Sequence, residues 1–65
     1  MNFLELFLHR NGLNPVASMN FLQASGLISD NCENAADVAT EDHGPAVAAL
    51  AAKFRLPLPA ALELF

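Results

Sequence analysis

The sequence predicts an all-α fold, a compact bundle of four to five short helices in a single domain over residues 1–65. Apolar side chains recur at spacings of three and four residues, which places them together on one face of a helix. Capping residues, prolines and glycines stand at the ends of these segments, where helices usually begin and end. These two patterns account for most of the chain.

The first two helices have clear start and stop signals. Asn2 can cap the first helix, and Gly12 ends it. The apolar residues of this helix recur at helical spacing and are Phe3, Leu4, Phe7 and Leu8. The second helix begins with Asn14 as its N-cap and Pro15 at its first position, where a missing N–H costs nothing. Gly26 then supplies the left-handed residue that ends it.

Two further helices are predicted after Gly26. Ser29 or Asp30 can cap a third, shorter helix, whose stripe consists of Cys32, Ala35, Ala36 and Ala39. The Asn, Asp and Ser residues of 27–34 also favour irregular structure, because their side chains compete for backbone hydrogen bonds. The fourth helix runs from Pro45, with Asp42 or Gly44 at its cap. Its apolar positions follow the same spacing and are Val47, Leu50, Ala51 and Phe54.

The remaining residues predict an elbow and a short last helix. Residues that precede proline are pushed out of the helical region, so Leu56–Pro59 should be extended. A fifth helical segment can follow from Pro59 to Phe65. The predicted core draws on the longer helices and comprises Phe3, Leu4, Phe7, Leu8, Met19, Phe21, Leu22, Val47, Leu50 and Phe54.

The composition points to a protein partner. Hydrophobic residues make up 54% of the chain and charged residues only 15%, against about 25% charged in a typical domain. A domain this small buries only about 60% of its unfolded surface, and the lone Cys32 excludes an internal disulfide. We therefore expect a non-enzymatic protein–protein interaction module that self-associates, as a homodimer, through apolar surface of the first helix or of the tail. The expected partner-binding residues are Leu56, Leu58, Leu62, Leu64 and Phe65.

The last four residues suggest an alternative function. Leu62–Phe65 repeats Leu4–Phe7 letter for letter. It resembles the short peptide by which many bacterial proteins dock on the replication sliding clamp, a Gln followed by Leu, an acidic or small residue, Leu and Phe. Ala61 stands where that peptide has its Gln. The resemblance implies a small phage-type or mobile-element regulator or inhibitor of a replication or transcription enzyme. Otherwise this segment folds back on its own core or on a sister subunit.

Acidic residues gather in one stretch of the chain. Five of the seven carboxylates lie between positions 29 and 43, where there is no Lys or Arg, and are Asp30, Glu33, Asp37, Glu41 and Asp42. They predict a solvated acidic face, with a docking surface for a basic partner or a nucleic-acid mimic as alternatives. Only three basic residues occur in the chain, too few to neutralise many phosphates, so direct nucleic-acid binding is not expected. A helix-turn-helix over 25–39 would turn these carboxylates toward phosphates.

Catalysis is not expected. The nucleophile and base types available are Ser18, Cys32, His9 and His43, and none belongs to a recognisable catalytic motif. We expect Cys32 to be a small buried thiol and His43 a surface imidazole beside Asp42.

Metal, cofactor and membrane binding are not expected either. A calcium loop starting at Asp30 would have Ala35 where the turn requires glycine. One Cys and two distant His fall short of the four ligands of zinc. No apolar run approaches the roughly 18 residues of a membrane span, and the first residues lack a basic signal region. We expect a soluble, cytoplasmic chain.

Overall fold

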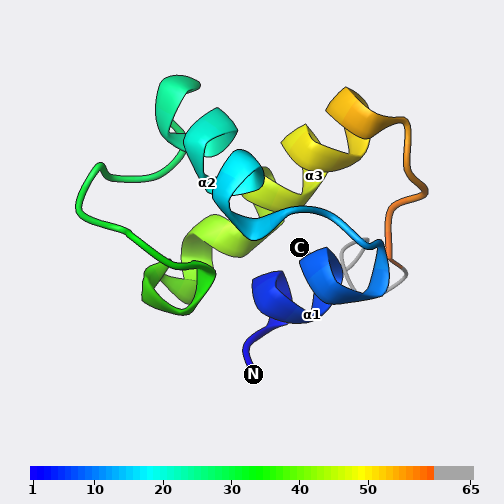
Figure 1. The fold of residues 1–65 in the computed structure, drawn as a ribbon, viewed down its shortest axis with the longest axis horizontal. Helices are drawn as coiled ribbons and strands as arrows, with labels where there is room; N and C mark the ends of the chain where they lie inside the picture. The colour runs from blue at the N-terminus through cyan, green and yellow to red at the C-terminus, as the bar shows by residue number, and fades with distance from the viewer. Residues whose placement is uncertain (60–65) are drawn as a thin grey trace.

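The computed structural model describes residues 1–59 of the chain. This part contains three α-helices and two single turns of 3₁₀ helix (Figure 1). The α-helices are α1 (Phe3–Arg10), α2 (Pro15–Ala24) and α3 (His43–Phe54), and the 3₁₀ turns are η1 (Ala35–Asp37) and η2 (Thr40–Asp42). The longest helix, α3, packs against both α1 and α2. No strand occurs in this part of the chain, so the all-α prediction is confirmed.

The predicted starts of α1 and α2 are confirmed by their caps. The Asn2 side-chain oxygen accepts a hydrogen bond from the Glu5 N–H at 2.8 Å, and the Glu5 carboxylate accepts one from the Asn2 N–H at 2.9 Å. This reciprocal pair satisfies two N–H groups that a helix start otherwise leaves without a partner. The Asn14 side chain accepts from the Ala17 N–H at 3.1 Å, and Pro15 opens α2.

The predicted third helix is wrong, and single turns replace it. Asn34 and Asp37 bracket η1, with the Asn34 N–H donating to the Asp37 carboxylate at 3.2 Å. Val38 and Ala39 then adopt extended backbone, with ψ of 129° and 143°. This backbone interrupts any continuous helix and lets the Val38 side chain enter the core. A second helix of a helix-turn-helix is therefore missing from residues 25–39.

The count of four to five helices is thus too high for residues 1–59, which contain three α-helices. The predicted fourth helix is α3, which begins at His43 and ends at Phe54; its C-cap residue, Arg55, has the left-handed conformation, with φ of 55°. Leu56–Pro59 has no regular secondary structure. The predicted fifth helix, from Pro59 to Phe65, falls almost wholly outside the described residues.

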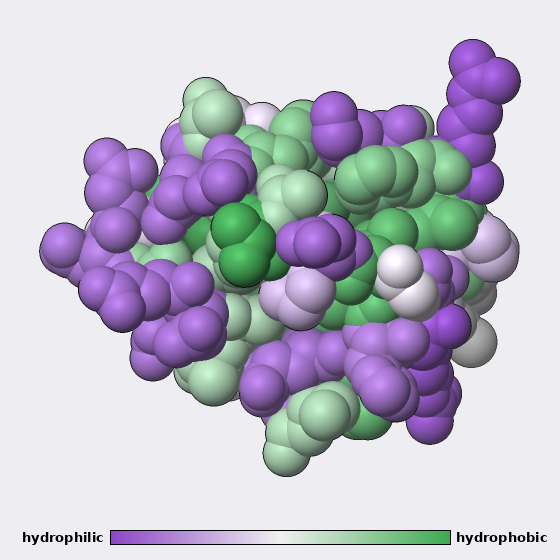
Figure 2. Space-filling view, viewed as in Figure 1, coloured by the Kyte–Doolittle hydropathy of each residue, from purple (hydrophilic) through white to green (hydrophobic). Residues whose placement is uncertain are grey.

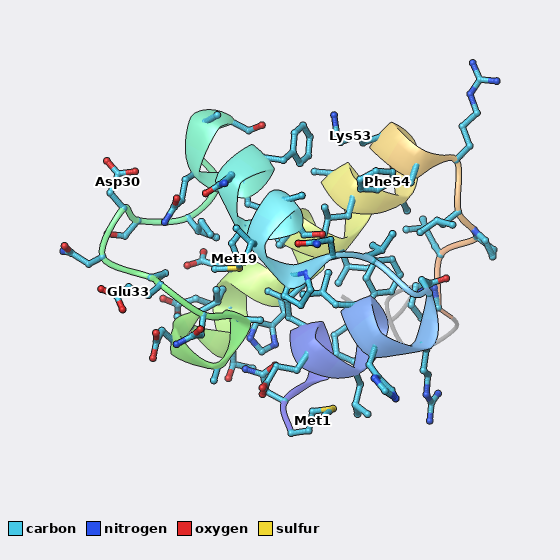
Figure 3. The ribbon with its side chains drawn as sticks, in the orientation of Figure 1. Met1, Met19, Asp30, Glu33, Lys53 and Phe54 are labelled. Carbon is cyan, nitrogen blue, oxygen red and sulfur yellow. The ribbon has the colours of Figure 1, made fainter. Side chains whose placement is uncertain are left out.

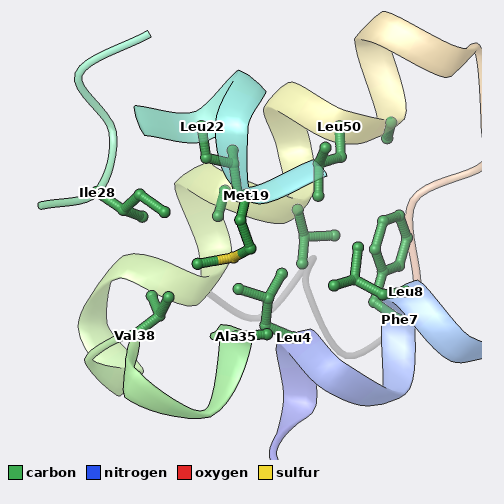
Figure 4. Packing of buried hydrophobic residues seen from close by; sticks show 12 residues of the cluster. Leu4, Phe7, Leu8, Met19, Leu22, Ile28, Ala35, Val38 and Leu50 are labelled. Atoms are coloured by element: carbon green, nitrogen blue, oxygen red, sulfur yellow. The ribbon is translucent and has the colours of Figure 1, made fainter. Parts of the chain in front are cut away.

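The core lies where the three helices and the segment between α2 and α3 converge (Figure 4). Seven predicted core residues are buried, namely Leu4, Phe7, Leu8, Met19, Leu22, Val47 and Leu50. Phe3 and Phe21 are only partly buried, and Phe54 is exposed. The sequence did not predict Ile28, Ala35, Val38, Ala46 and Ala51, which complete the core. Ile28 and Val38 enter the core because the segment that connects α2 to α3 points these side chains toward Met19.

Two apolar grooves beside the first helix

Two grooves flank α1, one on the side of the proline segment and one on the side of the acidic residues. The proline-side groove has a volume of about 250 Å³, and its lining residues are Phe3, Leu6, Phe7, Arg10, Asn11, Pro57, Leu58 and Pro59. The acidic-side groove, at about 490 Å³, is larger. It is lined by Met1, Glu5, Leu8, His9, Gly12, Leu13, Pro15, Val16, Met19, Glu33, Asn34 and Ala35.

The proline-side groove forms because α1 has a wider apolar face than the core can cover. Phe7 points into the core and is buried, while Leu6 stays 37% exposed beside it. Pro57 and Pro59 keep the chain after α3 out of helical conformation, so it runs along α1 as the other wall. Leu58 on that wall is 49% exposed.

Two of the predicted partner-binding residues lie within the described part of the chain. Leu58 lines the proline-side groove. Leu56 is half-buried and packs against the core instead. Leu62, Leu64 and Phe65 lie outside the described residues. The sequence named the first helix and the proline segment as separate surfaces, and the structure brings them together.

The acidic-side groove was not predicted. Its floor is made by buried residues of three segments, Leu8, Met19 and Ala35. Its rim includes Met1 and Val16, which are 78% and 69% exposed. Val16 was not among the residues predicted to bind a partner.

The predicted acidic residues are exposed, with one exception. Asp30, Glu33, Asp37 and Glu41 are exposed, and Asp42 is half-buried. Hydrophilic residues gather at the end of the molecule that carries this segment (Figure 2). Figure 3 shows Asp30 and Glu33 at that end and Lys53 away from them, beside Phe54.

The basic residues lie away from the acidic segment. The Lys53 ammonium stands 4.6 Å from the centroid of the Phe21 ring and 5.7 Å from that of Phe54, distances at which a cation is attracted to an aromatic face. Arg10 lines the proline-side groove. Within residues 1–59, Glu41 and Asp42 directly precede α3 whereas Lys53 and Arg55 stand at its end, so the two ends of this helix carry opposite charge.

The nucleophile and base types do not form a catalytic arrangement. Among the described residues, no hydrogen bond joins any two of Ser18, Cys32, His9 and His43. The Cys32 thiol is half-buried and lies 3.6 Å from the Asp37 carbonyl oxygen. The Ser18 hydroxyl is buried, and neither it nor His43 Nδ1 has a hydrogen-bond partner.

The prediction that His43 lies at the surface is wrong. Its side chain is only 3% exposed, and Nε2 lies 3.0 Å from the Val38 carbonyl oxygen. This contact holds the extended backbone at Val38 against the start of α3. His43 is therefore a structural residue at the junction of the acidic segment and the core.

Residues 1–59 contain neither a cluster of metal ligands nor a membrane-spanning helix. No three His, Cys, Asp or Glu side chains gather there as a metal ion would require. No helix in that range has the length and apolar character to cross a membrane.

No protein-family model, curated protein or solved structure matches this chain. The function is accordingly argued from the two grooves and the charges around them.

Proposed function

We propose that this chain is a non-enzymatic protein–protein interaction module that forms a homodimer through the proline-side groove. The observation that carries the proposal is the convergence of Leu6 and Leu58, each partly exposed, on the two walls of one apolar groove. Their apolar surface is in contact with water in the single chain, and burying it stabilises an assembly by about 25 cal/mol per Å².

A two-fold arrangement fits this surface. In such a dimer the same patch of both copies forms the contact, so each apolar residue of the patch is buried in both subunits. Arg10 at the rim can cover the edge of the contact with its aliphatic stem while its guanidinium stays in water. The small core adds a reason to self-associate, since a domain of this size usually requires a staple, and oligomerisation is one.

Sedimentation equilibrium of the full chain tests this proposal, with Leu58→Ser as the variant and Val16→Ser as its matched control. Val16 is more exposed than Leu58 and lines only the other groove. We expect a wild-type dimer, a dissociation constant at least about tenfold higher for Leu58→Ser because two leucines are lost per dimer, and no change for Val16→Ser. Far-UV circular dichroism checks that all three chains keep their helicity. A wild-type monomer, or an equal effect of both substitutions, would contradict the proposal.

The alternative function, a regulator that docks through Leu62, Leu64 and Phe65, rests on the resemblance of the last four residues to the clamp-docking peptide. A chain ending at Ala61 separates the two surfaces. If it dimerises as the full chain does, the groove is sufficient for self-association. If it becomes monomeric with its helicity intact, the contact lies in the removed residues and the groove is not the interface.

A further inference from the structure

We propose that the acidic-side groove binds a basic amphipathic helix of another protein, with apolar side chains of that helix in the groove and its Lys or Arg residues beside Glu5 and Glu33. This goes beyond the proposed self-association, which uses the groove on the other flank of α1. The shape, the rigidity and the charge of the acidic-side groove support this occupant.

The groove has apolar walls and a closed floor. Leu8 and Met19 are almost fully buried beneath it, while Met1 and Val16 stand at its rim with most of their surface exposed. Its volume, about 490 Å³, is the larger of the two grooves' volumes. The unbranched thioether side chains of Met1 and Met19 can adapt to side chains of different shape.

The wall between α1 and η1 is held in place before any partner binds. The Asn2 side chain donates a hydrogen bond to the Ala35 carbonyl oxygen at 2.9 Å and also caps α1. The Glu5 carboxylate accepts from the Asn2 N–H, so its position at the rim is set by the same cluster. A groove with fixed walls loses less conformational entropy when a ligand enters.

The charge around the groove is negative. Glu5 and Glu33 are among its lining residues, and no Lys or Arg is. His9 also lines the groove, whereas Arg10, the one Lys or Arg of α1, lines the opposite groove and Lys53 lies over aromatic rings. The rest of the 29–43 segment adds four more carboxylates. Charges farther from a site than a Debye length of about 8 Å at physiological salt are largely screened, so the lining residues Glu5 and Glu33 carry most of the preference for a cationic partner over nucleic acid.

A helix is the form of partner that the groove accepts best. Residues 1–59 contain no strand, so this surface has no sheet edge to which an extended peptide could add main-chain hydrogen bonds. An amphipathic helix instead presents apolar anchors at spacings of three and four residues. Its basic residues then fall at the two edges of the apolar stripe, opposite the acidic rim.

Fluorescence anisotropy with a labelled peptide tests the proposal on the full chain. The probe is an amphipathic helical peptide of about 14 residues, or four turns, made of leucine and lysine. Two control peptides replace either every lysine with glutamate or every leucine with serine. We expect the probe to bind and both control peptides to bind at least about tenfold more weakly, because charge and apolar contact each contribute.

Matched substitutions locate the binding. Glu33→Lys changes a lining residue, whereas Glu41→Lys makes the same charge change in the same acidic segment, outside the groove. We expect the dissociation constant to be about tenfold higher for Glu33→Lys and to change less than about threefold for Glu41→Lys, since Coulomb energy falls with distance. Val16→Ser should also weaken binding, while Leu58→Ser should bind normally even as a monomer.

Three results would overturn the proposal. The glutamate peptide binds as tightly as the probe, or Glu33→Lys and Glu41→Lys weaken binding equally, or Val16→Ser converts a dimer to a monomer. The last result would mean that a second copy covers this groove. Failure of the proposed dimer is distinguishable, because wild type and Leu58→Ser would then sediment alike while peptide binding stayed intact.

Discussion

Asn2 joins two parts of the fold, and its replacement should cost more than the loss of a helix cap. Its side-chain oxygen caps α1 by accepting from the Glu5 N–H at 2.8 Å, and its side-chain nitrogen donates to the Ala35 carbonyl oxygen in η1 at 2.9 Å. A cap contributes about 1 kcal/mol. A hydrogen bond of this kind contributes about 1 kcal/mol more. Asn2→Ala should therefore lower the free energy of unfolding by about 2 kcal/mol.

Two matched variants separate these contributions. Asn14→Ala removes the same residue type from the cap of α2, where the only side-chain bond is the local one to Ala17, so it should cost about 1 kcal/mol. Asn2→Asp keeps a good capping oxygen and replaces the donor with an acceptor that faces the Ala35 carbonyl. It should cost at least about 1 kcal/mol, because the bond is lost and a carboxylate oxygen then faces the carbonyl oxygen.

Urea unfolding followed by circular dichroism measures these differences. All chains must be compared at one protein concentration, because self-association adds to the apparent stability. For a domain of this size, each 1 kcal/mol should lower the melting temperature by roughly 4–8 °C. If Asn2→Ala and Asn14→Ala destabilise the chain equally, the bond between Asn2 and η1 contributes nothing and the reasoning is refuted.

Three further substitutions test the core and the ends of α3. Leu22→Ala empties the centre of the core and should cost about 3 kcal/mol, whereas Val16→Ala, at an exposed site, should change the urea midpoint little. His43→Ala removes the partner of the Val38 carbonyl. Amide exchange in residues 35–42 should then accelerate at least about tenfold, and unchanged exchange would show that the contact does not hold this segment. Arg55→Gly should raise the melting temperature, because Arg55 has φ of 55° and glycine adopts that conformation at a cost lower by up to about 1 kcal/mol; a lower melting temperature would contradict this.

The helix starts were predictable because their signals are local. Asn2 and Asn14 each bond to an N–H three residues ahead, and Pro15 needs no partner for its missing N–H. Such interactions depend on residues within one turn of helix, so the sequence displays them directly. The third predicted helix is absent for a related reason. In a single turn the Asp37 carboxylate accepts a hydrogen bond from the Asn34 N–H, and side chains of these types compete with helix in this way.

The candidate sites were predictable only in part. Leu58 was expected to bind a partner and lines a groove, but its position opposite Leu6 depends on how the chain returns after α3. The acidic-side groove combines residues of α1, α2 and the segment before η1, and no sequence pattern links them. Val16 and Glu33 acquire their proposed role in partner binding only because the fold brings these segments together.

By itself, the sequence determined the all-α class, the starts of α1 and α2, the separation of acidic from basic residues, and an excess of apolar side chains. Periodicity, capping and composition act within a few residues, so they can be read without a fold. The tertiary structure alone decided that His43 and Val38 are buried while Phe54 and Val16 are exposed. Burial depends on which distant segments cover a side chain, and the extended crossing between α2 and α3 supplies that cover in this protein.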